Sequence, residues 1–137
     1  MSDSPTVPDA DLVDDGRSVY RLEYHLLLAT RRQRPFFDDV DFRARAGEMV
    51  VETCHAAGCE VLSAEFGSRT LRLHVSAPPT LSPHALVVRL RAMAGAMRAE
   101  FPALKANGGL FVRRYIATSV PASATACERF VRAVPTR

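Results

Sequence analysis

Residues 18–30 read SVYRLEYHLLLAT, a run dominated by aromatic, branched and leucine side chains. Within it Arg21, Glu23 and His25 fall on one face, and aromatic or leucine side chains fall on the other. This period of two is typical of a β-strand with one face buried. The basic turn Arg31-Arg32-Gln33-Arg34-Pro35 follows and ends the run. The pattern predicts a first strand over residues 18–30.

Periodicity and capping residues predict six further elements downstream of this strand. They are a helix from Asp38 or Asp39 to about Ala57, strands at 60–66 and 71–76 joined by Gly67-Ser68, a helix from Ser82 to Phe101 ended by Pro102, a strand at 110–120 and a helix at about 123–134. The order β-α-β-β-α-β-α predicts an α+β, ferredoxin-like or RRM-like sandwich. Its sheet should be mainly antiparallel, with a C-terminal helix added.

Length and composition favour one globular domain. The chain has 137 residues, 47% of them hydrophobic and 24% charged, which is ordinary for a soluble protein. Residues 1–17 are polar and rich in Asp, so we predict a flexible acidic tail there and a single domain over 18–137. An acidic start is the wrong chemistry for a signal peptide. We therefore expect a cytoplasmic, nucleoid-associated protein.

The basic charge is concentrated in the predicted domain. The net charge is +3, but the first sixteen residues hold five Asp and no Lys or Arg, so the remainder carries +8. Seventeen of the eighteen basic residues are Arg, and Lys105 is the exception. Arginine binds phosphate through a planar, bidentate fork, which suits nucleic acid. A GC-rich genome also produces many Arg and Ala codons, so charge alone does not decide between the two.

The three cysteines do not indicate a metal or disulfide framework. Cys54, Cys59 and Cys127 form no spaced metal motif, and their number is odd. Cys54 and Cys127 fall on predicted core faces, where a thiol packs as a small hydrophobic group. We expect no cofactor and no metal.

Four ordered blocks of sequence carry a family resemblance. They are Tyr24-His25-Leu26 with Thr30-Arg31-Arg32 and Arg34-Pro35, the segment 75–79 with Leu81-Ser82 and the helix start at 86–91, the strand 110–120, and Arg129-Phe130-Val131. Together they resemble the HUH-type single-tyrosine transposases, which include the small single-strand insertion-sequence transposases and the REP-associated tyrosine transposases. The resemblance spans about residues 18–134 and implies the same fold.

The resemblance also locates the catalytic positions. Family members use two His on one strand to bind a divalent metal, and a helix supplies a nucleophilic Tyr and, four residues later, a Gln. By the resemblance these positions fall on Thr70, Arg72, Phe130 and Val134. Arginine is always cationic and repels a metal ion, and Phe has no nucleophilic atom. We therefore expect no catalytic residues, and no enzyme activity by the family mechanism.

Arginines are the candidate DNA-binding residues. Arg113 and Arg114 are neighbours on a predicted strand, so they should point to opposite faces. An Arg at a former metal position can still hold a phosphate by charge. The alternative for each Arg is a surface ion pair or plain solvation. The full candidate set is Arg31, Arg32, Arg34, Arg69, Arg72, Arg113 and Arg114.

The sequence therefore favours a catalytically inactive, repurposed transposase-like protein that binds DNA and regulates transcription or DNA structure. The resemblance implies a homodimer and, as target, a hairpin or a duplex with an inverted repeat. One alternative is a protein-interaction or scaffold module on the same fold. A second is a metal-dependent single-strand DNA nuclease with a rearranged site built on His25 and His74.

Overall fold

A four-stranded antiparallel sheet forms the centre of the protein in a computed structural model that describes residues 6–137. The sheet order is β4-β5-β3-β6. The strands are β3 (Leu22–Thr30), β4 (Glu60–Phe66), β5 (Thr70–Ala77) and β6 (Phe111–Thr118). The first predicted strand thus supplies a central strand, and it pairs with β5 on one side and β6 on the other.

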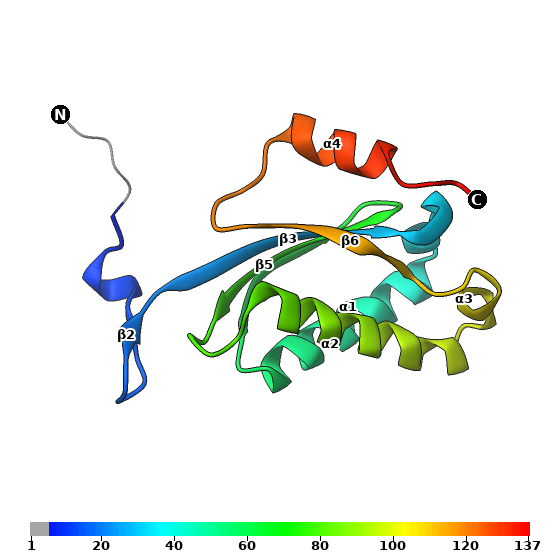
Figure 1. The fold of residues 1–137 in the computed structure, drawn as a ribbon. Coiled ribbons are helices and arrows are strands. Elements are labelled where there is room, and N and C mark those ends of the chain that lie inside the picture. The colour runs from blue at the N-terminus through cyan, green and yellow to red at the C-terminus, as the bar shows by residue number, and fades with distance from the viewer. Residues whose placement is uncertain (1–5) are drawn as a thin grey trace.

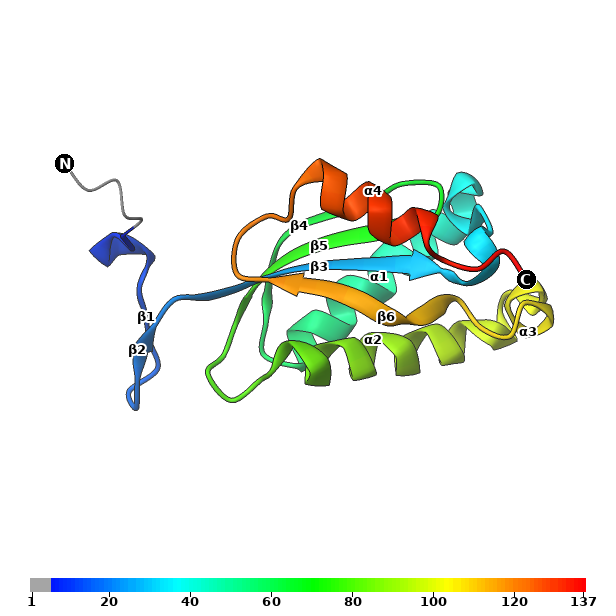
Figure 2. The same ribbon diagram turned by 45° about the horizontal axis from the view of Figure 1, so that its top comes forward.

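Helices lie on both faces of this sheet. Helices α1 (Val40–Ala56) and α2 (Pro83–Ala96) cover one face, and α4 (Ala124–Arg132) lies against the other (Figures 1 and 2). The predicted β-α-β-β-α-β-α order and the ferredoxin-like, mainly antiparallel sheet are confirmed. No helix within residues 6–137 is long and apolar enough to cross a membrane.

The hydrophobic core lies between the sheet and the helices α1 and α2. Alternate residues of β3 and β5 point into it, and Leu26, Leu28, Leu71 and Leu73 are all buried. Burying one such leucine stabilises the fold by about 1.5–3 kcal/mol. The residues between them, such as Leu27 and Arg72, face α4 on the opposite side of the sheet.

Side-chain caps begin the three longest helices. Asp39 accepts a hydrogen bond from the Phe42 amide (3.0 Å), and Ser82 accepts one from Ala85 (3.1 Å). Ser123 does the same for the Ala126 amide (3.1 Å). These bonds satisfy N–H groups that have no partner within the helix. The helix starts predicted from the sequence are therefore confirmed.

The second helix ends earlier than its apolar pattern predicts. Helix α2 stops at Ala96 and continues as a 3-10 turn, η4 (Met97–Ala99). Pro102 begins a short helix, α3 (Pro102–Ala106), so the prediction that Pro102 ends the second helix was wrong. Proline lacks an N–H group, and the first turn of a helix is where that group is not needed.

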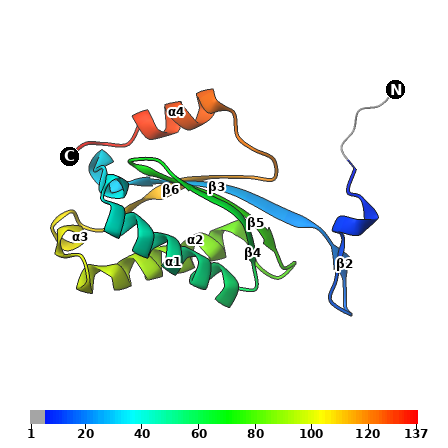
Figure 3. The ribbon, with the colours of Figure 1, turned by 180° about the vertical axis from the view of Figure 1, so that it is seen from behind.

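A small N-terminal arm stands apart from the sheet (Figure 3). It contains a 3-10 turn, η1 (Asp9–Asp11), and a two-stranded ribbon of β1 (Val13–Asp14) and β2 (Val19–Tyr20). The sequence pattern predicted neither η1 nor β1, and Arg21 divides the predicted first strand into β2 and β3. The start of the expected acidic tail, including Asp3, lies outside the described residues.

Candidate nucleic-acid interface

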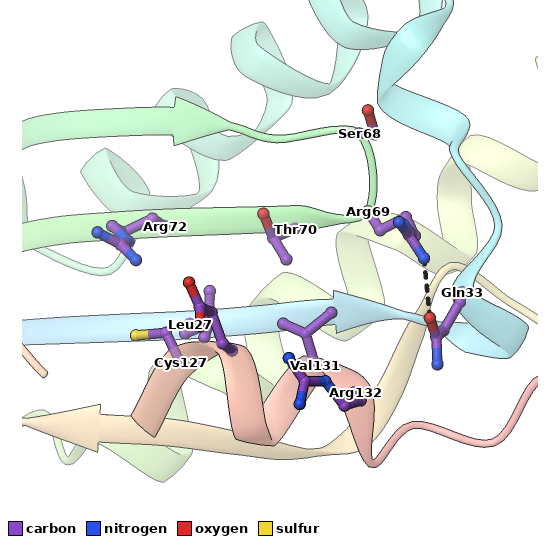
Figure 4. Close-up of a pocket in the computed structure, with 10 residues that line it drawn as sticks. Leu27, Gln33, Ser68, Arg69, Thr70, Arg72, Cys127, Val131 and Arg132 are labelled. Atoms are coloured by element: carbon purple, nitrogen blue, oxygen red, sulfur yellow. Dashed lines mark hydrogen bonds between the residues drawn. The ribbon is translucent and has the colours of Figure 1, made fainter. Parts of the chain in front are cut away.

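A hollow of about 500 Å³ lies between α4 and the sheet (Figure 4). Strands β3 and β5 form its floor, and α4 and the turns at 33 and 68–69 form its sides. The residues that line it are Leu27, Gln33, Ser68, Arg69, Thr70, Arg72, Cys127, Glu128, Val131 and Arg132. Three of the predicted site residues, Arg69, Thr70 and Arg72, therefore lie in one place.

Strand register places Thr70 and Arg72 on the floor of this hollow. The two residues are two positions apart on β5, so their side chains share one face of the sheet. Arg72 lies opposite Leu27 of β3. A Cβ atom at Gly67 would lie only 2.6 Å from Oγ1 of Thr70, so the tight approach at the β4–β5 turn requires glycine.

The basic turn after β3 has an unusual backbone. Arg32 and Gln33 have positive φ angles of 58° and 54°, a conformation that costs about 1–3 kcal/mol for each non-glycine residue. Asn107 Nδ2 donates to the Arg31 carbonyl (3.1 Å), and Thr30 Oγ1 donates to the Arg34 carbonyl (2.8 Å). These side-chain hydrogen bonds hold the turn in its strained form.

Gln33 connects this turn to the residue before β5 and to the segment that follows α4. Its Nε2 donates to the Val134 carbonyl (2.7 Å), and its Oε1 accepts from Nη1 of Arg69 (2.8 Å; Figure 4). Sequence reasoning did not single out Gln33. The sequence does mark Gln33 as the one uncharged residue among the arginines at 31–34. Its contacts, however, become evident only in the folded chain.

The resemblance implies that Phe130 and Val134 face Thr70 and Arg72, but another pair of residues lies there. Cys127 and Val131 line the hollow. Phe130 and Val134 line a neighbouring hollow beside β6, together with Val112, Arg113 and Arg114. The members of each pair are four residues apart, and the sequence pattern of a helix over about 123–134 places all four on one apolar face, so the pattern did not distinguish the pairs. In the structure α4 ends at Arg132, before Val134.

The charge of the hollow suits an anion. Arg69, Arg72 and Arg132 line it, against the single carboxylate of Glu128. No ion pair within residues 6–137 involves Arg69, Arg72 or Arg132. Arg69 donates one hydrogen bond to Gln33, and its other N–H groups can contact a ligand. No group of three or more His, Cys, Asp or Glu in this part of the chain is placed to share a metal ion.

The tyrosines lie elsewhere. Tyr115 and Tyr24 pack against the core on the α1–α2 side of the sheet. The Tyr115 hydroxyl is 3.0 Å from Nδ1 of His84, and Tyr24 donates to the Leu81 carbonyl. Tyr20 belongs to the N-terminal arm. The hollow beneath α4 is therefore lined by no tyrosine.

His25 and His74 stack, and His25 lines a small hollow that shares Leu27, Arg72 and Cys127 with the one beneath α4. Their ring centroids are 3.9 Å apart, and Nε2 of His74 lies 2.7 Å from Oε1 of Glu23. Burial and the neighbouring His74 lower the pKa of His25. Burial acts to raise the pKa of Glu23, but hydrogen bonds to His74 and Arg21 outweigh it and lower that pKa. The alternation of β3 places Glu23 and His25 on one face, and the pairing of His25 with His74 brings the second histidine beside both.

The remaining candidate arginines do not join this hollow. Arg31 and Arg113 line a second hollow next to α2, and Arg113 also borders the one beside β6, where Arg114 lies. Arg34 borders an apolar hollow formed by aromatic residues, and Arg32 is exposed. The basic turn therefore distributes its side chains over several surfaces.

Comparisons with known proteins agree with this architecture. The family model described as "Transposase IS200 like" matches residues 18–132. The crystal structure of a transposase candidate from Deinococcus radiodurans R1 superposes with a TM-score of 0.80 at 24% identity, over 91% of this chain and 100% of that one. A REP-associated tyrosine transposase bound to a REP hairpin gives a TM-score of 0.56 at 9% identity, over 89% and 70%. No curated protein matches the sequence.

Proposed function

Because the chain belongs to the IS200-like transposase family, we propose that it binds DNA in the hollow beneath α4 without cutting it. The observation that carries this proposal is Arg72. Its guanidinium occupies the floor of the hollow, at a position where the family resemblance implies a metal-binding His. A fixed cation there attracts a phosphate and repels a divalent metal ion.

Binding is supported by the arginines around the hollow. Arg69, Arg72 and Arg132 converge on it without an ion-pair partner within residues 6–137. Guanidinium groups contact phosphate through two parallel hydrogen bonds, so each can neutralise one backbone phosphate. The solved REP-associated transposase is bound to a REP hairpin. We therefore propose hairpin DNA, or a duplex with an inverted repeat, as the ligand.

Loss of cleavage is supported by the same side chains. Phosphoryl transfer in this hollow would need a nucleophile and a group that stabilises the developing charge. The helix offers Cys127 and Val131 there, and Cys127 is only 7% exposed. Phe130 and Val134, in the neighbouring hollow, carry no nucleophilic atom. No activity by the family mechanism is expected with either pair.

A homodimer completes the proposal. The outer strands β4 and β6 each pair on one side only within residues 6–137, so their free edges can join a second copy. Two copies related by a two-fold axis would read an inverted repeat. Such a protein would act at the chromosome as a regulator of transcription or of DNA structure.

The test combines binding with cleavage. The full chain is titrated with a labelled hairpin and with a duplex inverted repeat at two salt concentrations, and then incubated with the hairpin and Mg²⁺ or Mn²⁺. We expect binding that weakens steeply with salt, because several arginines contact phosphate, and no nicking. No binding at low salt would refute the DNA proposal. Metal-dependent nicking or a covalent protein–DNA adduct would refute the loss of cleavage.

A further inference from the structure

A second hollow lies on the other side of β6, against α2 and the loop that precedes the strand (Figure 2 shows α2 beside β6). It has a volume of about 280 Å³, close to the lower limit of ligand pockets. Four arginines line it, and no Asp or Glu does: Arg31, Arg91, Arg98 and Arg113. We call it the arginine hollow.

Two glycines bring arginines close to the backbone here. A Cβ atom at Gly108 would lie 3.6 Å from Nε and Nη2 of Arg31, and one at Gly109 would lie 3.3 Å from Nη2 of Arg98. Both glycines have positive φ angles, 78° and 124°. A side chain at either position would be strained, and at Gly109 it would also crowd the Arg98 guanidinium, whereas Arg31 lies at ordinary van der Waals distance from Gly108. The loop thus keeps Arg31 and Arg98 directed at one place.

Arg91 has an unused donor in the same hollow. Its Nη2 donates to the Val112 carbonyl (2.8 Å), but its Nε is buried and has no hydrogen-bond partner. Burial, followed by the charge of Arg113, lowers the pKa of Arg91. None of the four arginines takes part in an ion pair within residues 6–137. The Nε of Arg91 is thus a buried donor without a partner, and the four like charges around the hollow repel one another, so a bound anion would stabilise this arrangement.

We propose that the arginine hollow binds a dianionic phosphate monoester, the group found at a phosphorylated DNA strand end. A backbone diester carries one negative charge, whereas a monoester carries about −1.5 to −2 at pH 7 and offers three acceptor oxygens. Four guanidinium groups around a small hollow match the monoester better, because it has the larger charge and more acceptor oxygens. That the phosphate belongs to a DNA end rests on the proposed function above. A free small molecule that carries a phosphate would offer the same group to the hollow.

The test separates these sources in phosphate-free buffer. The full chain is titrated with inorganic phosphate and with dimethyl phosphate, while the Gly108 and Gly109 amides are followed by NMR. Single-stranded oligonucleotides of one sequence, with a hydroxyl or a phosphate at the 5′ or 3′ end, are compared by fluorescence anisotropy. Arg98→Gln and Arg113→Gln, both exposed in the free chain, are the variants. Arg89→Gln, exposed on α2 but outside the hollow, is the matched control.

We expect inorganic phosphate, but not dimethyl phosphate, to shift both glycine amides, and a terminal phosphate to tighten DNA binding about tenfold. Both effects should disappear in the two variants and persist in Arg89→Gln. Shifts with phosphate but no preference among DNA ends would support the site and assign it a free small phosphate. No shift, together with equal affinity for all ends, overturns the site and leaves the DNA proposal standing. Phosphate shifts in a chain that binds no DNA refute the proposed function alone.

Discussion

Arg72 of β5 lies directly opposite Leu27 of β3, and both side chains line the hollow beneath α4. The pairing places a permanent cation on the floor of the hollow, next to an apolar surface and without a carboxylate partner within residues 6–137. A strand register shifted by one residue would send Arg72 into the core. The DNA-binding proposal therefore depends on this one register.

Replacing Arg72 should weaken DNA binding in a salt-dependent way. If Arg72 neutralises one phosphate, Arg72→Gln removes one counterion-release event, and the slope of log K against log salt should fall by about 0.9. Fluorescence anisotropy with a hairpin at four salt concentrations measures this slope. Arg43→Gln, exposed on α1 on the opposite side of the sheet, is the matched control. An unchanged slope in the Arg72 variant would remove this residue from the interface.

Gln33 should stabilise the attachment of α4 to the body of the protein. Gln33→Ala removes the hydrogen bonds to the Val134 carbonyl and to Arg69, and we expect the free energy of unfolding to fall by about 1–3 kcal/mol. Urea unfolding followed by circular dichroism measures the change. Glu52→Ala, at an exposed position of α1, should change stability by less than about 0.5 kcal/mol. Equal stabilities for the two variants would show that the Gln33 bonds contribute nothing.

Stability should decrease as the pH falls below about 6.5. The pKa of His25 is lowered in the folded state, so the unfolded chain takes up a proton first, near its ordinary value of about 6.5. The lowered pKa of Glu23 adds a further loss below about 4.5. His25→Gln should flatten the stability curve between pH 7 and pH 5. His55→Gln, exposed at the end of α1, should keep the slope of the parent chain, and a parent curve without slope would exclude this role of His25.

Gly67 and Thr70 should show strong energetic coupling. Gly67→Ala places a Cβ 2.6 Å from Oγ1 of Thr70, and we expect a loss of about 1–3 kcal/mol. Thr70→Ala removes that oxygen, so the double variant should recover much of the loss in a double-mutant cycle. Gly95→Ala in α2 meets no atom within 4 Å and should stabilise the helix by about 0.5–1 kcal/mol. Additive effects of the Gly67 and Thr70 changes would contradict the close contact.

Several features of the fold and the site followed from local patterns. The period of two in residues 22–28, the caps at Asp39 and Ser82 and the turn at Gly67 predicted the order of elements correctly. The two-residue spacing of Thr70 and Arg72 placed both on one face of β5. These predictions succeed because strand alternation, helix capping and tight turns depend on residues close together in the chain.

The sequence by itself determined the chemistry available: seventeen arginines, and no tyrosine after Tyr115. Only the tertiary structure decided where that chemistry lies. It turned Cys127 and Val131, rather than Phe130 and Val134, toward Thr70, and it separated Arg31 from Arg69. The physical reason is that a helix with a broad apolar face can pack on a sheet in more than one rotation about its own axis, at similar local cost. In the same way, the residues of a turn can direct their side chains to either side of a sheet. Packing against β3, β5 and β6 selects one arrangement, and the chain positions involved are up to about one hundred residues apart, as in the hydrogen bond between Gln33 and Val134.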